Sequence, residues 1–415
     1  MYLLLADHLY KRFRIDAHYF LEGGFWLTAS QIVTIIFGIL STALFAHFLS
    51  EQDYGVYRYL IGLAVLFSSL SLTGLGQSIL QTAAKEHYGF YLETIKLNFY
   101  YSLPITFISL AGVVYYFMRE NTILSLGCIL IAVVQPIINA FQNTSTFLQG
   151  SRRFKEATIS QGIKILFISI TSIATLFFTK NILALLCVYL GSTALSNIFY
   201  HFVYRPKQSS TTHPDIAHRY INYAKSTSVR NIVSLISNRL DTVIIFTQLG
   251  AAELAVYTIA TIIPEQIKAS FKNLASLLLP KYAKHANIDI IKRSVPKRSL
   301  QLFLVLLTVT VLYIIVTPYV YALLFPKYQG AIALSQMAAL AFPTFILYIP
   351  YSILQSRLAE AELHRITIYS SVFQVVTIFC FISFFGLLGA IIARLLYRIF
   401  FMFTVYAYFY KMKTL

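Results

Sequence analysis

The stretch Phe48-Leu-Ser-Glu-Gln-Asp-Tyr-Gly-Val-Tyr57 returns in altered form 200 residues later, as Gln248-Leu-Gly-Ala-Ala-Glu-Leu-Ala-Val-Tyr257. Each copy separates two long apolar segments. The same offset pairs Ile32-Val33 with Ile232-Val233. Because the matches cluster at segment boundaries in one register, they indicate an internal repeat and not a chance likeness of apolar helices. A repeat of this kind is typical of transporters that bind their substrate between two halves.

The rest of the chain is strongly apolar, with 58% hydrophobic and only 12% charged residues and a mean hydropathy of +0.69. A soluble domain carries about 25% charged residues, so the composition indicates a polytopic membrane protein. A helix needs about 20 residues to cross a bilayer. We predict twelve such spans, at 24–48, 55–80, 95–118, 122–148, 157–179, 182–204, 220–247, 253–280, 298–324, 331–355, 365–385 and 387–410.

These spans predict an all-α integral membrane protein made of two six-helix bundles around a central cavity. Six helices per half let both copies enter from the same side, so the repeat is parallel. We expect a first bundle at 1–204, with a short cytosolic segment at 1–23, a cytosolic linker at 205–219 and a second bundle at 220–415.

The net charge of +17 lies mostly in short loops and not in one soluble basic domain, which argues against nucleic-acid binding. The loops on one side of the predicted spans hold 21 basic residues. The other side has only Arg119, Lys180 and Lys327. By the positive-inside rule, both termini are expected in the cytosol.

Beyond the first two residues of each predicted span, nine basic residues lie inside the spans: Arg58, Lys164, Lys225, Arg230, Arg239, Lys268, Lys272, Arg394 and Arg398. Only two carboxylates, Asp241 and Glu265, share that zone. A cation at a helix centre costs about 2.5–3.5 kcal/mol on insertion scales, so it usually faces a polar interior or a partner. Most of these cations should therefore lack a protein counter-charge, and a cavity that they line would suit a large anionic solute. Snorkelling to the membrane surface is the alternative for those near span ends.

A polar stripe runs along the predicted span 220–247 at the spacing of one helix face. The matching face of the first span is polar as well but carries no charge. We expect both helices to line one cavity, although helix packing through small residues would also explain the first stripe. The candidate cavity-lining residues are Gln31, Thr34, Ser41, Ser234, Ser237 and Asn238.

The two carboxylates deep in the spans, Asp241 and Glu265, admit two interpretations. One is that they bind a coupling cation or exchange protons, since carboxylates inside membranes are usually functional. The other is that each only neutralises a nearby basic residue, Arg230 for Asp241 and Lys268 for Glu265.

No catalytic or metal-binding motif is present in the sequence. It has no Walker A phosphate loop, no Gly-x-Ser-x-Gly turn and no His-Glu-x-x-His run. The cysteines Cys128, Cys187 and Cys380 all lie in apolar runs and have no metal-ligand spacing. We therefore expect neither an enzyme nor a cofactor.

Several stretches resemble polysaccharide-unit flippases of the O-antigen (Wzx) type. They are Gly23-Gly24-Phe25-Trp26 together with Leu49 to Tyr57, Leu148-Gln-Gly-Ser-Arg-Arg-Phe154, Asp241 to Tyr257, and Gly386-Leu-Leu-Gly-Ala390. These flippases belong to the superfamily of multidrug, oligosaccharidyl-lipid and polysaccharide exporters. The resemblance implies alternating access in the bacterial cytoplasmic (inner) membrane. It also implies an undecaprenyl-diphosphate-linked oligosaccharide as substrate, for surface polysaccharide assembly, with membrane lipids and polysaccharide polymerase machinery as partners.

Bidentate arginine contacts suit the phosphates of such a substrate. The candidate diphosphate-binding residues are Arg58, Arg230, Lys268, Lys272, Arg394 and Arg398. The alternative function is an ion-coupled multidrug antiporter of the same superfamily, which would need exposed carboxylates for its cationic substrates. The first-half spans contain no central Asp or Glu, which counts against that alternative.

Overall fold

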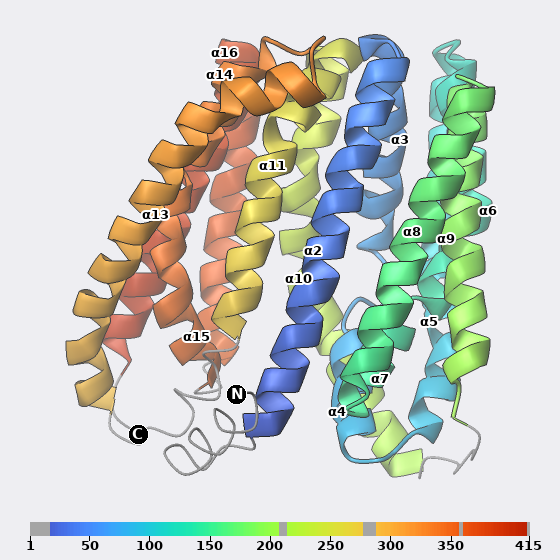
Figure 1. Cartoon of the computed structure of the whole chain (residues 1–415). Coiled ribbons are helices and arrows are strands. Elements are labelled where there is room, and N and C mark those ends of the chain that lie inside the picture. Colours follow the sequence, from blue (N-terminus) through green and yellow to red (C-terminus); the bar gives the residue numbers. More distant parts are fainter. Residues whose placement is uncertain (1–16, 207–213, 277–287, 357–359, 413–415) are drawn as a thin grey trace. The chain divides into compact units, whose positions relative to one another are not determined.

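A computed structural model describes residues 17–206, 214–276, 288–356 and 360–412 (Figure 1). All regular elements within these ranges are helices, and none of the described residues forms a strand. The all-α prediction is therefore confirmed. Eight helical stretches in the described part are long and apolar enough to cross a membrane. The count of twelve spans stays a prediction.

The chain divides into two compact units. The first holds Met1–Ser41 and Leu63–Ile232, and the second holds Thr42–Gly62 and Val233–Leu415. The units follow the two sequence halves except that 42–62 belongs to the second unit and 220–232 to the first. Three helices, α2 (Ala17–Phe48), α3 (Glu51–Ser68) and α10 (Pro214–Gln248), contribute to both units. Of the predicted linker, 207–213 lies outside the described residues.

In the first unit, two long helices, α5 (Gly89–Met118) and α6 (Thr122–Phe141), pack along each other (Figure 1). Helix α6 also packs against α9 (Ile182–Tyr204), which in turn packs against α8 (Phe154–Phe178). Asparagine caps begin two of these helices. The Oδ1 atom of Asn121 accepts from Leu124 N at 3.1 Å, and that of Asn181 accepts from Leu183 N at 2.9 Å. Such caps satisfy backbone donors that the first turn leaves free.

The predicted span 55–80 is wrong as a single helix, because α3 ends at Ser68 and α4 (Leu75–Ala84) begins six residues later. Serine hydroxyls in the break compete for backbone carbonyls: Ser69 Oγ donates to Leu66 O at 2.6 Å, and Ser71 Oγ donates to Ser68 O at 2.7 Å. Gly74 is the last residue of the break. A Cβ atom there would lie 2.3 Å from Ala224 O, so only glycine allows this approach.

Two other predicted spans are also interrupted. The span 122–148 contains α6 and a separate short helix, α7 (Thr144–Gly150). The span 331–355 contains α14 (Ala331–Ala339), the 3-10 helix η1 (Phe342–Leu347) and α15 (Tyr348–Ser356). Pro343 at the start of η1 has no backbone donor, which favours a helix boundary there.

In the second unit, the predicted break between the last two spans is confirmed. Helix α16 (Glu360–Lys411) is interrupted at Gly386, whose φ of 56° and ψ of −134° are not helical. A Cβ atom on Gly389 would lie 1.8 Å from Phe381 O, so the two arms of α16 approach through glycine. These positions explain why the closing Gly386–Ala390 stretch carries two glycines.

Helix α11 (Ala251–Ser276) contains Pro264, which cannot donate to the carbonyl of Ala260. Tyr321 on α13 (Ile288–Leu324) compensates from the neighbouring helix. Its buried hydroxyl lies 2.9 Å from Ile259 O and 3.4 Å from Ala260 O, and 2.8 Å from Ser335 Oγ on α14. These contacts hold the part of α11 that leads into Glu265.

The two repeated stretches lie against each other within the second unit. A Cβ atom on Gly55 would be 1.8 Å from Ala251 O, so the start of α3 and the start of α11 are in backbone contact. Nearby, the rings of Tyr59 and Phe246 stack with centroids 3.7 Å apart. The repeat that is visible in the sequence therefore forms a close contact in the fold.

Candidate functional site

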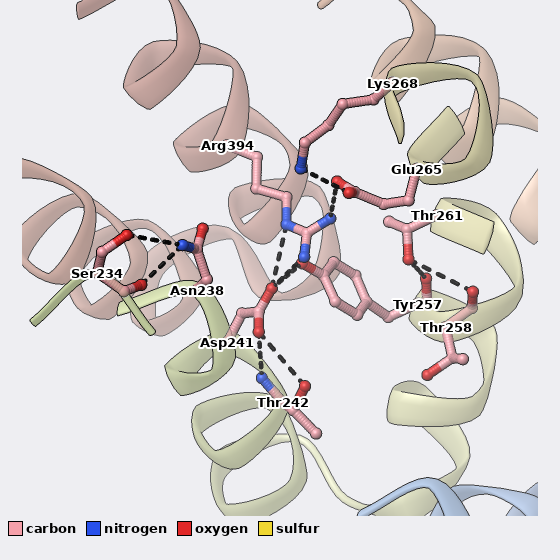
Figure 2. A network of polar contacts seen from close by, with 10 residues as sticks. All are labelled: Ser234, Asn238, Asp241, Thr242, Tyr257, Thr258, Thr261, Glu265, Lys268 and Arg394. Carbon is pink, nitrogen blue, oxygen red and sulfur yellow. Dashed lines mark hydrogen bonds and ion pairs between the residues drawn. The ribbon is translucent and has the colours of Figure 1, made fainter. Parts of the chain in front are cut away.

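The most highly connected polar site in the described part of the chain lies in the second unit, centred on Arg394 of α16 (Figure 2). Its guanidinium group binds one carboxylate from α10 and another from α11. The Nε and Nη2 atoms donate to Asp241 Oδ2 at 3.1 and 2.5 Å, and Nη1 donates to Glu265 Oε1 at 3.2 Å. One arginine therefore joins three helices.

Helical periodicity places the contributing side chains on facing surfaces. On α11, Tyr257, Thr261, Glu265 and Lys268 follow one another at spacings of four, four and three residues, which puts them on one face (Figure 2). This face continues directly from the second copy of the repeated stretch, because that copy ends at Tyr257. Pro264 lies immediately before the first charged residue of the face.

Asp241 is fixed in place by donors from several directions. Its side chain is only 2% exposed. Besides the two bonds from Arg394, it accepts from Tyr257 Oη at 2.6 Å and from Thr242 N at 2.7 Å. The guanidinium carbon of Arg394 also lies 5.2 Å from the centroid of the Tyr257 ring. These donors fix the orientation of the Asp241 side chain.

Glu265 is held more loosely. Its side chain is 41% exposed, and its two oxygens serve different partners. Oε2 accepts from Lys268 Nζ at 2.6 Å, while Oε1 accepts from Arg394. The pairing of Glu265 with Lys268 that the sequence indicated is thus present. For Asp241 the expected partner was Arg230, whereas the structure shows Arg394.

The expectation that most of the cations lack a counter-charge is corrected for Arg394 and Lys268, which are both paired. It holds for three neighbours, because no described carboxylate forms an ion pair with Arg58, Arg239 or Arg398. Arg239 lies within electrostatic range of Arg58 and Arg394, and Arg398 within range of Glu265 and Lys268. Positive charge therefore exceeds negative charge around the network.

Arg398 rests on aromatic rings and not on a carboxylate. Its guanidinium carbon lies 5.9 Å from the centroid of Phe345 and 5.6 Å from that of Tyr397. Such cation–π contacts stabilise a cation that has no carboxylate partner. The side chain is only partly buried.

The remaining predicted residues are distributed between the two units. Gln31, Thr34 and Ser41 lie on α2 in the first unit, whereas Ser234, Ser237 and Asn238 lie on α10 in the second. Asn238 Nδ2 donates to Ser234 O at 2.7 Å beside the ionic network (Figure 2). That these two groups line one cavity stays a prediction. Arg230 and Lys272 belong to α10 and α11, and their side chains lie outside the described residues.

In the first unit, the polar contacts that escaped the sequence analysis include those of Lys164 and His201. Lys164 Nζ on α8 donates to Asn197 Oδ1 at 2.6 Å on α9. His201 Nδ1 lies 2.9 Å from the hydroxyl of Tyr91 on α5. No sequence signal joins residues this far apart along the chain, so these partners could be found only in the fold.

The network can hold an anion without any metal or cofactor. Arg394, Arg398 and Lys268 bring about thirteen N–H donors to neighbouring positions, by the ordinary inventory of about five per arginine and three per lysine. Asp241 and Glu265 use only a part of them. A ligand with several anionic oxygens would match the unused donors.

The sequence profile of the family described as polysaccharide biosynthesis protein matches residues 20–274. The chain belongs to this family. The matched region includes the first repeat, Asp241 and Glu265, and it ends before α16. No curated protein matched the chain.

Several solved structures of transporters share the fold of this chain. An outward-facing multidrug resistance MATE family transporter of the MOP superfamily matches with a TM-score of 0.64 and 13% identity, over 95% of this chain and 94% of the other. An inward-facing multidrug resistance MATE family transporter of the same superfamily matches with a TM-score of 0.65 and 13% identity, over 91% of this chain and 94% of the other. A MOP superfamily transporter from Pyrococcus furiosus, whose binding pocket is described as reversed in polarity, matches with a TM-score of 0.63 and 13% identity, over 95% of both chains.

The family match confirms the resemblance at the level of the family, and the solved structures show a shared fold. The chain is a multi-pass membrane protein that shares its fold with these transporters. At 13% identity, the structural likeness shows the fold and does not extend to a substrate.

Proposed function

We propose that this protein flips an undecaprenyl-diphosphate-linked oligosaccharide from the cytosolic to the outer leaflet of the bacterial cytoplasmic membrane. The movement would occur by alternating access and would supply surface polysaccharide or O-antigen assembly. Membership of the polysaccharide biosynthesis family supports the biosynthetic role. The excess of cations around Arg394 is the observation that carries the choice of a diphosphate-linked substrate.

The energetic argument is a balance between insertion and ligand binding. Each central cation costs a few kcal/mol to place in the membrane. Charge-assisted bonds to phosphate oxygens in a site partly shielded from water offset much of that cost. We propose that the diphosphate is bound by Arg58, Arg230, Lys268, Lys272, Arg394 and Arg398, and that Gln31, Thr34, Ser41, Ser234, Ser237 and Asn238 line the path of the substrate.

Coupling to an ion gradient is assigned to Asp241 and Glu265. Both already hold basic partners, but the exposed Glu265 is the better placed of the two to exchange a proton. Asp241→Asn and Glu265→Gln should abolish gradient-driven flux while the protein is still made. Normal gradient-driven flux in both variants would remove this assignment.

The function is tested by gene deletion in the bacterium that makes the protein. The deletion strain should accumulate lipid-linked oligosaccharide on the cytosolic face, and the intact gene should restore export. If single alanine variants at Arg230, Lys272, Arg394 and Arg398 all restore export and bind a diphosphate-lipid analogue as before, the diphosphate assignment is contradicted. Both termini should be cytosolic, with membrane lipids and polysaccharide polymerase machinery as partners.

The alternative, ion-coupled antiport of cationic drugs, fits the site less well. A cationic drug needs an available carboxylate, but the buried Asp241 already accepts from five donor atoms and Glu265 bridges two cations. Drug susceptibility of the deletion strain separates the two functions. If the deletion strain shows unchanged lipid-linked oligosaccharide and raised drug sensitivity, the antiporter is favoured.

A further inference from the structure

Glu265 bridges two cations that come from different helices, with one carboxylate oxygen for each (Figure 2). Lys268 reaches Oε2 at 2.6 Å, and Arg394 Nη1 reaches Oε1 at 3.2 Å. A phosphate group offers the same bridging arrangement, because it presents several oxygens around one centre. It also carries more negative charge than a carboxylate, so it would bind the same two donors more strongly.

The two carboxylates on Arg394 are unequal. Asp241 takes the Nε edge of the guanidinium group, is 2% exposed, and is tied to Tyr257 and to its own helix. Glu265 takes only Nη1, is 41% exposed, and has no donor apart from the two cations among the described residues. Displacing Asp241 would strand a buried charge, which is strongly unfavourable. Displacing Glu265 would break only its bonds to the two cations, because its side chain is already partly exposed.

We propose that Arg394 and Lys268 form an anion subsite for the diphosphate, and that Glu265 is an internal competitor which occupies this subsite until the substrate displaces it. Asp241 acts as a positioning residue that holds the guanidinium group of Arg394 in place. The inference rests on the proposed function for the source of the diphosphate, but the subsite itself can be tested without transport. It separates the roles of two carboxylates that the sequence left equivalent.

Arg398 adds to this subsite without competing for its carboxylates. It lies within electrostatic range of Glu265 and Lys268, and it is supported by the rings of Phe345 and Tyr397. A second phosphate of the substrate could extend from Arg394 towards Arg398, four residues further along the same helix face. The return of Glu265 to Arg394 and Lys268 would then help to release the substrate.

The test measures binding of inorganic pyrophosphate to the purified full-length protein by titration calorimetry. Glu265→Gln removes the competing charge and should tighten binding by about fivefold or more, the size of one partly exposed ion pair. Glu265→Asp keeps the charge but withdraws it by one methylene, so that it can no longer span both cations. It should also bind pyrophosphate more tightly than the unaltered protein.

Glu156→Gln is the matched control. Glu156 forms an ion pair with Arg153 at the same spacing of three residues, and its side chain is 38% exposed. The substitution makes the same change in net charge in the first unit, and it should leave pyrophosphate binding unchanged. Equal gains in Glu156→Gln and Glu265→Gln would reduce the effect to overall charge and overturn the proposal.

A parallel titration with farnesyl diphosphate distinguishes a lipid-linked anion from a free one. A gain for Glu265→Gln with both ligands supports the subsite in lipid transport, whereas a gain with pyrophosphate alone overturns that role. No gain with either ligand, in both Glu265→Gln and Glu265→Asp, overturns the competition. If Glu265→Gln binds both ligands more tightly but the deletion strain exports lipid-linked oligosaccharide normally, the subsite is supported and the proposed function fails.

Discussion

The hydroxyl of Tyr257 makes a hydrogen bond whose contribution to stability can be predicted from the structure. It donates to Asp241 Oδ2 at 2.6 Å, and the tyrosine is only 3% exposed. Tyr257→Phe keeps the ring and its contact with Arg394 but removes this donor. A hydrogen bond to a charged group contributes about 1.5–3 kcal/mol, and buried partners cannot replace it with bulk water.

We therefore expect Tyr257→Phe to lower the stability of the second unit by about 1.5–3 kcal/mol. For a unit of about 200 residues, each kcal/mol shifts the melting temperature by about 2–4 °C, so the expected drop is about 3–12 °C. The assay is thermal unfolding of the detergent-purified protein, followed by the loss of the monodisperse peak on size exclusion.

Tyr328→Phe is the control. Tyr328 is also in the second unit and only 2% exposed, but its hydroxyl has no hydrogen-bond partner among the described residues. Removing a buried hydroxyl without a partner should leave the melting temperature unchanged or raise it slightly. If Tyr257→Phe melts within about 1 °C of Tyr328→Phe, the bond to Asp241 does not stabilise the network and the reasoning is refuted.

Three further predictions follow from the fold and the site. Gly55→Ala should reduce the yield of folded protein and lower its stability by about 1–3 kcal/mol or more, because the added methyl group overpacks the contact. Gly191→Ala should be tolerated, because the added methyl group would meet open space. Equal yields of the two variants would disprove the backbone contact. Arg394→Lys should lower transport about tenfold at normal protein levels, because lysine keeps the charge but loses the planar fork, and Arg394→Ala should do worse; full transport by the lysine variant would show that charge alone suffices. In intact cells, an impermeant thiol reagent should label a cysteine that replaces Glu120 but not one that replaces Arg153, and external labelling at position 153 would reverse the predicted topology.

Local sequence patterns predicted the contacts of the site that lie within one helix. The spacing of Glu265 and Lys268 predicted their ion pair, and this pair is present at 2.6 Å. The same type of spacing put Arg394 and Arg398 on one face of their helix. Side chains three or four residues apart on a helix must lie near each other, so such contacts are fixed before the helix meets any other.

The partner of Asp241 could not be found in this way. Arg394 lies 153 residues further along the chain, and the sequence offered Arg230 on the same helix instead. The choice between them depends on the crossing and rotation of α10 and α16, which packing of the whole unit decides. Tyr257, the other partner, was visible only as the last residue of a repeat.

The sequence by itself determined the membrane class, the repeat, the polar helix faces and the break at Gly386, because composition, helical period and glycine geometry act over a few residues. Tertiary structure alone decided that 42–62 joins the second unit and that the span 55–80 breaks at its serines. It also decided that Arg394 binds both deep carboxylates, since such contacts require helices from distant parts of the chain to pack together.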